Sequence, residues 1–242
     1  MSRTFQLDHW LWGSLDWLFP PVCGGCSRKG FRWCPDCQRQ VICVPEPVCQ
    51  SCGLPLSHPG LCTLCHDSPP PYKAIRSWVV FEGPIRHAIH AMKYGRNVAL
   101  GEAFAPHLAG FVRKLGWRVD LVVPVPLGRQ RMMERGYNQV GLIAKPLAAI
   151  QGWHYSPDVL VRTRETRSQV GLSPLERKEN ISGAFRAEPV LAAGKSVLLV
   201  DDVVTTGATL AACSDALAKA GAEVVYALTL ARALPHHGLQ IV

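Results

Sequence analysis

Residues 196–209 read Ser-Val-Leu-Leu-Val-Asp-Asp-Val-Val-Thr-Thr-Gly-Ala-Thr, and this stretch decides the fold class. Its apolar run predicts a buried strand from Lys195 to Val200, and a helical pattern from Thr206 to Ala220 follows. A strand that is apolar on both faces is typical of a parallel sheet covered by helices on both sides. The stretch therefore predicts an α/β domain with a polar turn at the carboxyl edge of its sheet, where ligands bind.

The turn between this strand and this helix is suited to a phosphate group. Gly207 lets backbone N–H groups approach an anion, the threonines add hydroxyl donors, and the helix adds its positive end. The adjacent carboxylates of Asp201 and Asp202 suit sugar hydroxyls. Capping of the helix alone would explain only one acid and one threonine. We therefore expect a monophosphate site formed by Thr205, Thr206, Gly207, Ala208 and Thr209.

Apolar runs and helical patterns alternate through the chain from Tyr72 onward. Further strands are expected at residues 75–81, 121–125 and 224–230, and further helices at 84–94, 99–115 and 139–150. A polar stretch separates the last of these helices from the strand at Lys195. This rhythm predicts a parallel sheet flanked by helices.

Eight of the ten cysteines form four Cys-x-x-Cys pairs: Cys23/Cys26, Cys34/Cys37, Cys49/Cys52 and Cys62/Cys65. Each spacer lets two sulfurs converge on one ion, so the pairs predict two structural zinc sites with no open position. A disulfide framework is disfavoured because adjacent pairs of this kind are poor geometry for bridges. Sequential and interleaved pairing both fit, and the shorter loops favour sequential pairing. Cys43, His58 and His66 are expected bystanders.

The composition changes at the Ser-Pro-Pro-Pro connector of residues 68–71, which marks a domain boundary. We expect an amphipathic helix over residues 1–20, a double zinc ribbon over 21–67 and the α/β domain over 72–242. The chain lacks the roughly 18 consecutive apolar residues of a membrane span and lacks a secretory cleavage pattern. We therefore expect a cytoplasmic protein without a membrane span.

The formal net charge is +8, which suggests a polyanionic partner or a phosphorylated ligand. Eight thiolates that bind two zinc ions would remove about half of this excess. Charge alone is therefore a weak argument for nucleic acid.

Residues 198–209 resemble the phosphoribosyl pyrophosphate (PRPP) motif of type I phosphoribosyltransferases. The resemblance implies that Thr205–Thr209 hold the ribose 5-phosphate and that Asp201 and Asp202 meet the ribose hydroxyls. Residues 123–129 resemble the pyrophosphate loop of that family, which implies pyrophosphate binding by Pro126, Leu127, Gly128 and Arg129, with Lys93 as a further candidate. It also implies that magnesium accompanies PRPP.

The arrangement of the whole chain resembles the ComF family, including the GntX-like DNA-utilisation proteins. The cysteine pairs carry this resemblance together with residues 91–94, 124–127, 134–139, 169–172 and 176–180. It implies zinc ribbons joined to a phosphoribosyltransferase domain, and a role in competence or in the use of DNA as a nutrient. Single-stranded DNA, a DNA-uptake helicase and other competence proteins are the partners that it implies.

The polar segment before the PRPP motif corresponds to the mobile catalytic flap of the family, so Gln169, Arg177 and Asn180 join Asp201 and Asp202 as catalytic candidates. Arg129, Arg131 and Arg135 follow the pyrophosphate loop and are the nucleic-acid candidates, although a solvated surface would explain many such charges. Nearby aromatics are Tyr94, Tyr137, Trp153 and Tyr155, for which a core role is favoured over base stacking.

Three functions stay open: a PRPP-binding protein that acts on or beside single-stranded DNA, a nucleobase salvage phosphoribosyltransferase, and a PRPP sensor without catalysis. The residues do not identify an acceptor, and they leave open whether phosphoribosyl transfer occurs.

Overall fold

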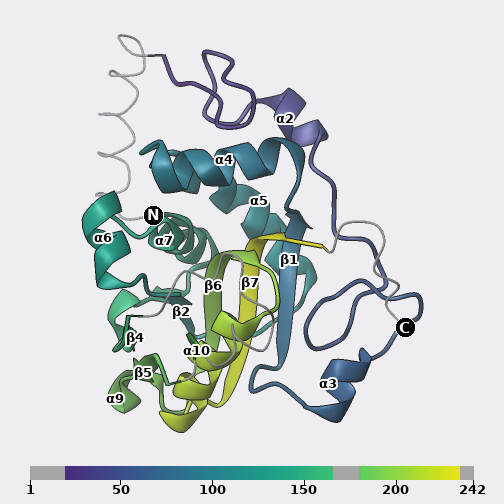
Figure 1. Ribbon diagram of the computed structural model, residues 1–242, viewed down its shortest axis with the longest axis vertical. Coiled ribbons are helices and arrows are strands. Elements are labelled where there is room, and N and C mark those ends of the chain that lie inside the picture. The colour runs from purple at the N-terminus through teal and green to yellow at the C-terminus, as the bar shows by residue number, and fades with distance from the viewer. Residues whose placement is uncertain (1–19, 166–179, 182, 235–242) are drawn as a thin grey trace.

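The computed structural model describes residues 20–165, 180–181 and 183–234. At its centre is a five-stranded parallel sheet in the order β1-β7-β6-β2-β3 (Figure 1). Its strands are β1 (Ala74–Val80), β2 (Leu121–Pro124), β3 (His154–Tyr155), β6 (Ser196–Val204) and β7 (Val224–Arg232). The predicted α/β class and parallel sheet are confirmed. The helix expected over residues 1–20 lies outside the described residues except for Pro20.

Helices cover both faces of the sheet, which is why the central strands are mostly apolar. One hydrophobic cluster joins alternate strand residues such as Leu198 and Val200 to α4 (Gly83–Tyr94), α5 (Leu100–Lys114) and α7 (Gln139–Gln151). The other joins Val197 and Leu199 to α10 (Ala208–Lys219). Successive side chains of a strand point to opposite faces, so β6 is buried on both sides.

Several short elements complete the domain. A two-stranded antiparallel sheet pairs β4 (Leu160–Arg162) with β5 (Phe185–Ala187), next to the 3-10 turn η1 (Pro157–Val159) and α9 (Pro189–Ala192). Helix α6 (Arg129–Arg135) follows β2. In the cysteine-rich segment, α2 is Pro35–Arg39 and α3 is Thr63–Asp67.

Strand β6 is longer than the apolar run predicted. It continues past Val200 to Val204, because β7 extends equally far and pairs Val204 with Arg232. Asp201 and Asp202 are therefore strand residues, and as neighbours in a strand their side chains point to opposite faces of the sheet.

The cysteine-rich segment packs on the α/β domain in two places. Its first half, with α2, lies next to α4, and its second half, with α3, lies beside the edge strand β1 (Figure 1). In the described ranges, no helix combines the length and the apolar character needed to cross a membrane.

Candidate functional site

The eight cysteines of the four pairs form two tetrads, and in each the sulfurs lie within 4.8 Å of one another. The sulfur–sulfur distance is 3.7 Å between Cys23 and Cys37 and 3.6 Å between Cys26 and Cys34. Tetrahedral zinc with bonds of about 2.3 Å places sulfurs about 3.8 Å apart, whereas a disulfide joins them at about 2.0 Å. The tetrads therefore fit zinc, and sequential pairing is confirmed: Cys23, Cys26, Cys34 and Cys37 form one site, and Cys49, Cys52, Cys62 and Cys65 form the other.

Backbone N–H groups prepare these sulfurs for a cation. Cys34 N donates to Cys23 Sγ over 3.4 Å, and Cys62 N donates to Cys49 Sγ over 3.3 Å. Burial opposes ionisation of Cys23 and Cys49, but the backbone N–H groups prevail and lower the pKa of each to about 6. Burial and the neighbouring sulfurs raise the pKa of Cys37. Four thiolates therefore need a bound cation to share one site.

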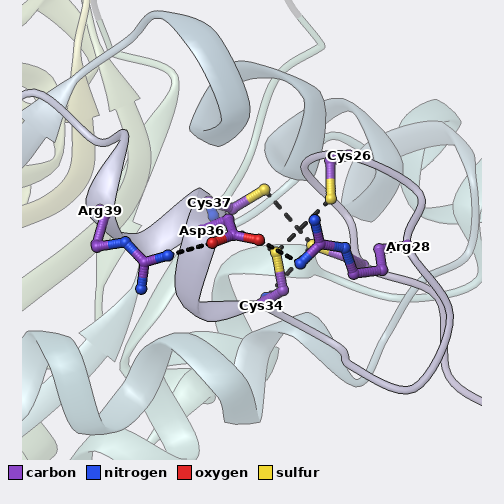
Figure 2. Close-up of polar contacts among 7 residues, drawn as sticks. Cys26, Arg28, Cys34, Asp36, Cys37 and Arg39 are labelled. Atoms are coloured by element: carbon purple, nitrogen blue, oxygen red, sulfur yellow. Dashed lines mark hydrogen bonds and ion pairs between the residues drawn. The ribbon is translucent and has the colours of Figure 1, made fainter.

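The first site has a charged exterior. Its sulfurs converge, while Asp36 lies between Arg28 and Arg39 and forms an ion pair with each of them (Figure 2). These exposed pairs contribute little to stability. Packing attaches this ribbon to the α/β domain, because the Trp33 ring meets Phe104 of α5 edge-on with 5.1 Å between centroids.

The second site is tied to the sheet by hydrogen bonds. Ile75 N of β1 donates to Ser51 O over 2.7 Å, and Arg76 Nη1 donates to Cys49 O over 3.3 Å. Arg232, only 3% exposed at the end of β7, donates to Cys52 O. Gly53 has φ +71°, and a Cβ there would lie 2.5 Å from Ile75 O. The ribbon thus covers part of the edge of β1, which would otherwise present unpaired backbone groups.

The turn after β6 forms an open pocket at the carboxyl edge of the sheet. Asp201 and residues 203–210 line it. Gly207, with φ +80°, is the N-cap of α10, and Ala208 N donates to Thr206 Oγ1 over 3.4 Å. The pocket therefore combines the N-terminus of a 12-residue helix with three threonines, as an anion site requires.

Asp201 faces this pocket, and its carboxylate accepts a 2.8 Å hydrogen bond from Asp202 N. The pKa of Asp201 is raised to about 7, mainly by burial and secondly by the negative charge of Asp202. A bound cation or hydroxyl donors would favour its ionised form.

Asp202 points to the opposite face of β6 and is 5% exposed. Its Oδ1 accepts from Lys93 Nζ at 2.9 Å, and its Oδ2 accepts from Gln139 Nε2 at 2.6 Å. Gln139 in turn accepts a 2.7 Å hydrogen bond from Arg135 Nη1. The sequence suggested Lys93 as a pyrophosphate-binding residue. In the structure it donates to Asp202, and the same carboxylate accepts from Gln139 of α7.

The predicted pyrophosphate loop, Pro126 to Arg129, connects β2 to α6. Arg129 N donates to the carboxylate of Glu165, and a Cβ on Gly128 would collide with that carboxylate. Gly128 therefore leaves room for an anionic group at a backbone N–H of this loop.

The remaining candidates are placed as follows. Arg129 and Arg131 are exposed on α6, and Arg135 is half-buried between Gln139 and the ring of Tyr94. Asn180 O accepts from Arg164 Nη2 over 3.0 Å. Gln169 and Arg177 lie outside the described residues.

Two family models match the chain in succession. A double zinc ribbon domain matches residues 14–66, and a phosphoribosyl transferase domain matches residues 134–237. The DNA utilization protein YhgH of Salmonella typhimurium is 37% identical over 235 residues, which cover 94% of this chain and 93% of that protein. The chain belongs to the ComF/YhgH family.

Other relatives of this ComF/YhgH protein also align with it over most of their own length. Competence protein F of Haemophilus influenzae is 31% identical over 83% of the chain and 90% of its own length. Competence protein ComFC of Streptococcus pneumoniae is 26% identical, with 87% of each protein covered. An adenine phosphoribosyltransferase structure from Thermoanaerobacter pseudethanolicus aligns with 60% of the chain and 86% of its own length, with a TM-score of 0.37 and 16% identity.

Sequence reasoning missed three residues of this ComF/YhgH protein that the structure brings to the site. Gln139 holds Asp202, Glu165 holds the Arg129 backbone, and Arg232 holds the second ribbon. Gln139 stands in the quoted segment 134–139 without an assigned role, whereas Glu165 and Arg232 carry no local signal.

Proposed function

We propose that this protein binds PRPP together with magnesium in the pocket at the end of β6. The observation that carries the proposal is the junction of Asp201 with the turn Thr205–Thr209 in one pocket at the N-terminus of α10. Backbone N–H groups and threonine hydroxyls suit the 5-phosphate, and the Asp201 carboxylate suits the ribose hydroxyls. The match to the phosphoribosyl transferase family supports the same assignment.

The pyrophosphate of PRPP would bind at the loop Pro126–Arg129. The hydrogen bond from Arg129 N to Glu165 supports this assignment, because a carboxylate of the chain itself already accepts from that loop. Magnesium would neutralise part of the pyrophosphate charge and so favour its departure. Asp202 would act by holding Lys93 and Gln139 in position, since both donate hydrogen bonds to its carboxylate.

We further propose that the protein acts on or beside single-stranded DNA, in competence or in the use of DNA as a nutrient. The names of relatives that align over most of the chain support this role. A cytoplasmic location and a helicase or competence partner for the ribbons belong to the same proposal. Arg129, at the end of the pyrophosphate loop, and Arg131, both exposed, would contact nucleic-acid phosphates together with the half-buried Arg135.

The deciding experiment measures pyrophosphate release from PRPP with magnesium, in the presence of each nucleobase or of a single-stranded oligonucleotide. Release that depends on the oligonucleotide is expected if transfer occurs, and Gln169, Arg177 and Asn180 are then the flap residues to substitute. Release with a free base would favour salvage. PRPP binding without release would favour a sensor, and absence of PRPP binding would refute the proposal.

A further inference from the structure

Three rings and one guanidinium form a chain of pairwise contacts at α4. The rings of Phe81 and His90 are stacked with 6.4 Å between centroids, and His90 lies 5.8 Å from the ring of Tyr94. The guanidinium of Arg135, from α6, lies over Tyr94 at 5.3 Å from the ring centroid. The His90 and Tyr94 rings are tilted by 56° to each other. These neighbouring planar groups, from Phe81 before α4, from α4 and from α6, are called here the stacking strip.

The outer members of this strip are not core residues. Tyr94 is 72% exposed, and His90 is exposed as well. Phe81 is partly buried against the main hydrophobic cluster, as are Trp153 and Tyr155, for which the sequence favoured a core role, so the exposed rings of the strip are those of His90 and Tyr94. Tyr94 therefore departs from the core role that the sequence favoured for the nearby aromatics.

Positive charge surrounds the strip. Burial lowers the pKa of His90, and the nearby positive charges of Lys93, Arg86 and His87 lower it further. Burial raises the pKa of Tyr137, and the nearby positive charges of Arg135 and Arg96 oppose this rise. The acidic side chains on these elements are Glu82, the N-cap of α4, and Glu134, which accepts a 2.9 Å hydrogen bond from Gln130.

The strip is also connected to the PRPP motif. Arg135 donates to Gln139, Gln139 donates to Asp202, and Lys93, next to Tyr94 in the chain, donates to the same carboxylate. Two hydrogen bonds, through Gln139, therefore connect the guanidinium over the Tyr94 ring to Asp202 of strand β6.

We propose that the stacking strip of Phe81, His90, Tyr94 and Arg135 binds the unpaired bases of single-stranded nucleic acid, while the surrounding cations contact its phosphates. The inference rests on the single-strand part of the proposed function and assigns it a surface. Aromatic faces with neighbouring cations are the means by which proteins bind single strands without reading sequence. A duplex keeps its bases stacked on one another, and an acidic peptide offers no series of planar groups, so both fit this strip less well.

The test is fluorescence anisotropy of the zinc-loaded full chain with a labelled 12-nucleotide oligothymidine, a matched abasic strand, the corresponding duplex and polyglutamate. Tyr94→Ala should weaken oligothymidine binding by about tenfold, because stacking contributes about 1–3 kcal/mol per base. Tyr94→Phe should retain binding within about threefold, and the abasic strand should bind both variants equally. Met133→Ala is the matched control, since Met133 is 79% exposed on the neighbouring helix but lacks a ring.

Oligothymidine binding that Tyr94→Ala leaves unchanged would overturn the strip and leave the proposed function standing. Equal affinity for oligothymidine, the abasic strand and polyglutamate would also overturn it, as an ordinary basic surface would give that result. If the parent binds no single strand, the strip and the DNA part of the proposed function both fail. PRPP affinity, measured on the same samples, then reports separately on the pocket.

Discussion

Gln139 Nε2 of α7 donates a 2.6 Å hydrogen bond to Asp202 Oδ2 of β6, and Lys93 Nζ of α4 occupies the other carboxylate oxygen. One acid of the PRPP motif is thereby joined to two helices on one face of the sheet. The other acid, Asp201, lines the pocket on the opposite face. Two adjacent carboxylates thus have different surroundings: Asp202 is hydrogen-bonded to two helices, and Asp201 lines the pocket.

Removal of either partner of Asp202 should destabilise the fold. Gln139→Leu should cost about 1–3 kcal/mol because it leaves a buried carboxylate oxygen unsatisfied, and Lys93→Met should cost about 3 kcal/mol because it leaves the charge unpaired. Urea unfolding measures both. Lys219→Met, which removes an exposed pair with Asp215, is the control and should cost less than about 0.5 kcal/mol. Equal costs for Lys93→Met and the control would contradict this role for Asp202.

Stability should respond to pH through Asp201. Its pKa is about 7 in the fold and about 3.9 in an unfolded chain, so the folded state holds the extra proton between these values. The contribution of Asp201 to the free energy of unfolding therefore falls as pH rises through this window and levels off above it. Asp201→Asn cannot ionise and should gain about 1 kcal/mol relative to the parent between pH 6 and pH 8. A stability difference that stays constant over this range would contradict the raised pKa.

The sequence predicted the strand-turn-helix at residues 196–209 because its signals are local: an apolar run, a glycine and a helical pattern. It also predicted both zinc sites, since spacing alone brings paired sulfurs together. It ended β6 four residues early, because two acids look like the end of a strand until β7 is known to pair beyond them. The contacts Gln139–Asp202 and Glu165–Arg129 join residues 63 and 36 positions apart, and no local pattern predicts such pairs.

The two zinc sites should differ in what their loss does to the sheet. Backbone carbonyls of the second ribbon accept hydrogen bonds from Ile75 N and from the Arg232 side chain, whereas the first ribbon packs on α5. Cys52→Ser should therefore increase hydrogen exchange at the Ile75 amide by about tenfold or more, because this local contact opens. Cys26→Ser should lose about one zinc ion and leave that amide protected. Equal exchange in the two variants, at equal zinc loss, would show that the ribbons support β1 equally.

Glu165 should compete with pyrophosphate for the loop at Arg129. Glu165→Ala frees the Arg129 backbone N–H and removes a negative charge, so inorganic pyrophosphate with magnesium should bind about tenfold more tightly. Glu134→Ala removes an exposed acid of α6 that bonds to Gln130 and should change the affinity far less. Competition binding against labelled pyrophosphate separates the two. Weaker binding by Glu165→Ala would instead make this carboxylate a part of the ligand site.

Calorimetric titration of PRPP with magnesium into the zinc-loaded full chain tests the central claim most directly. Parent protein should bind one PRPP per chain, and Thr206→Val, which keeps the shape of the side chain but removes its hydroxyl, should weaken binding by about fivefold or more. Phosphate alone should compete for the same site. Absence of PRPP binding by folded, zinc-loaded parent, or an affinity that Thr206→Val leaves unchanged, would contradict the assignment of the β6 turn as the PRPP site.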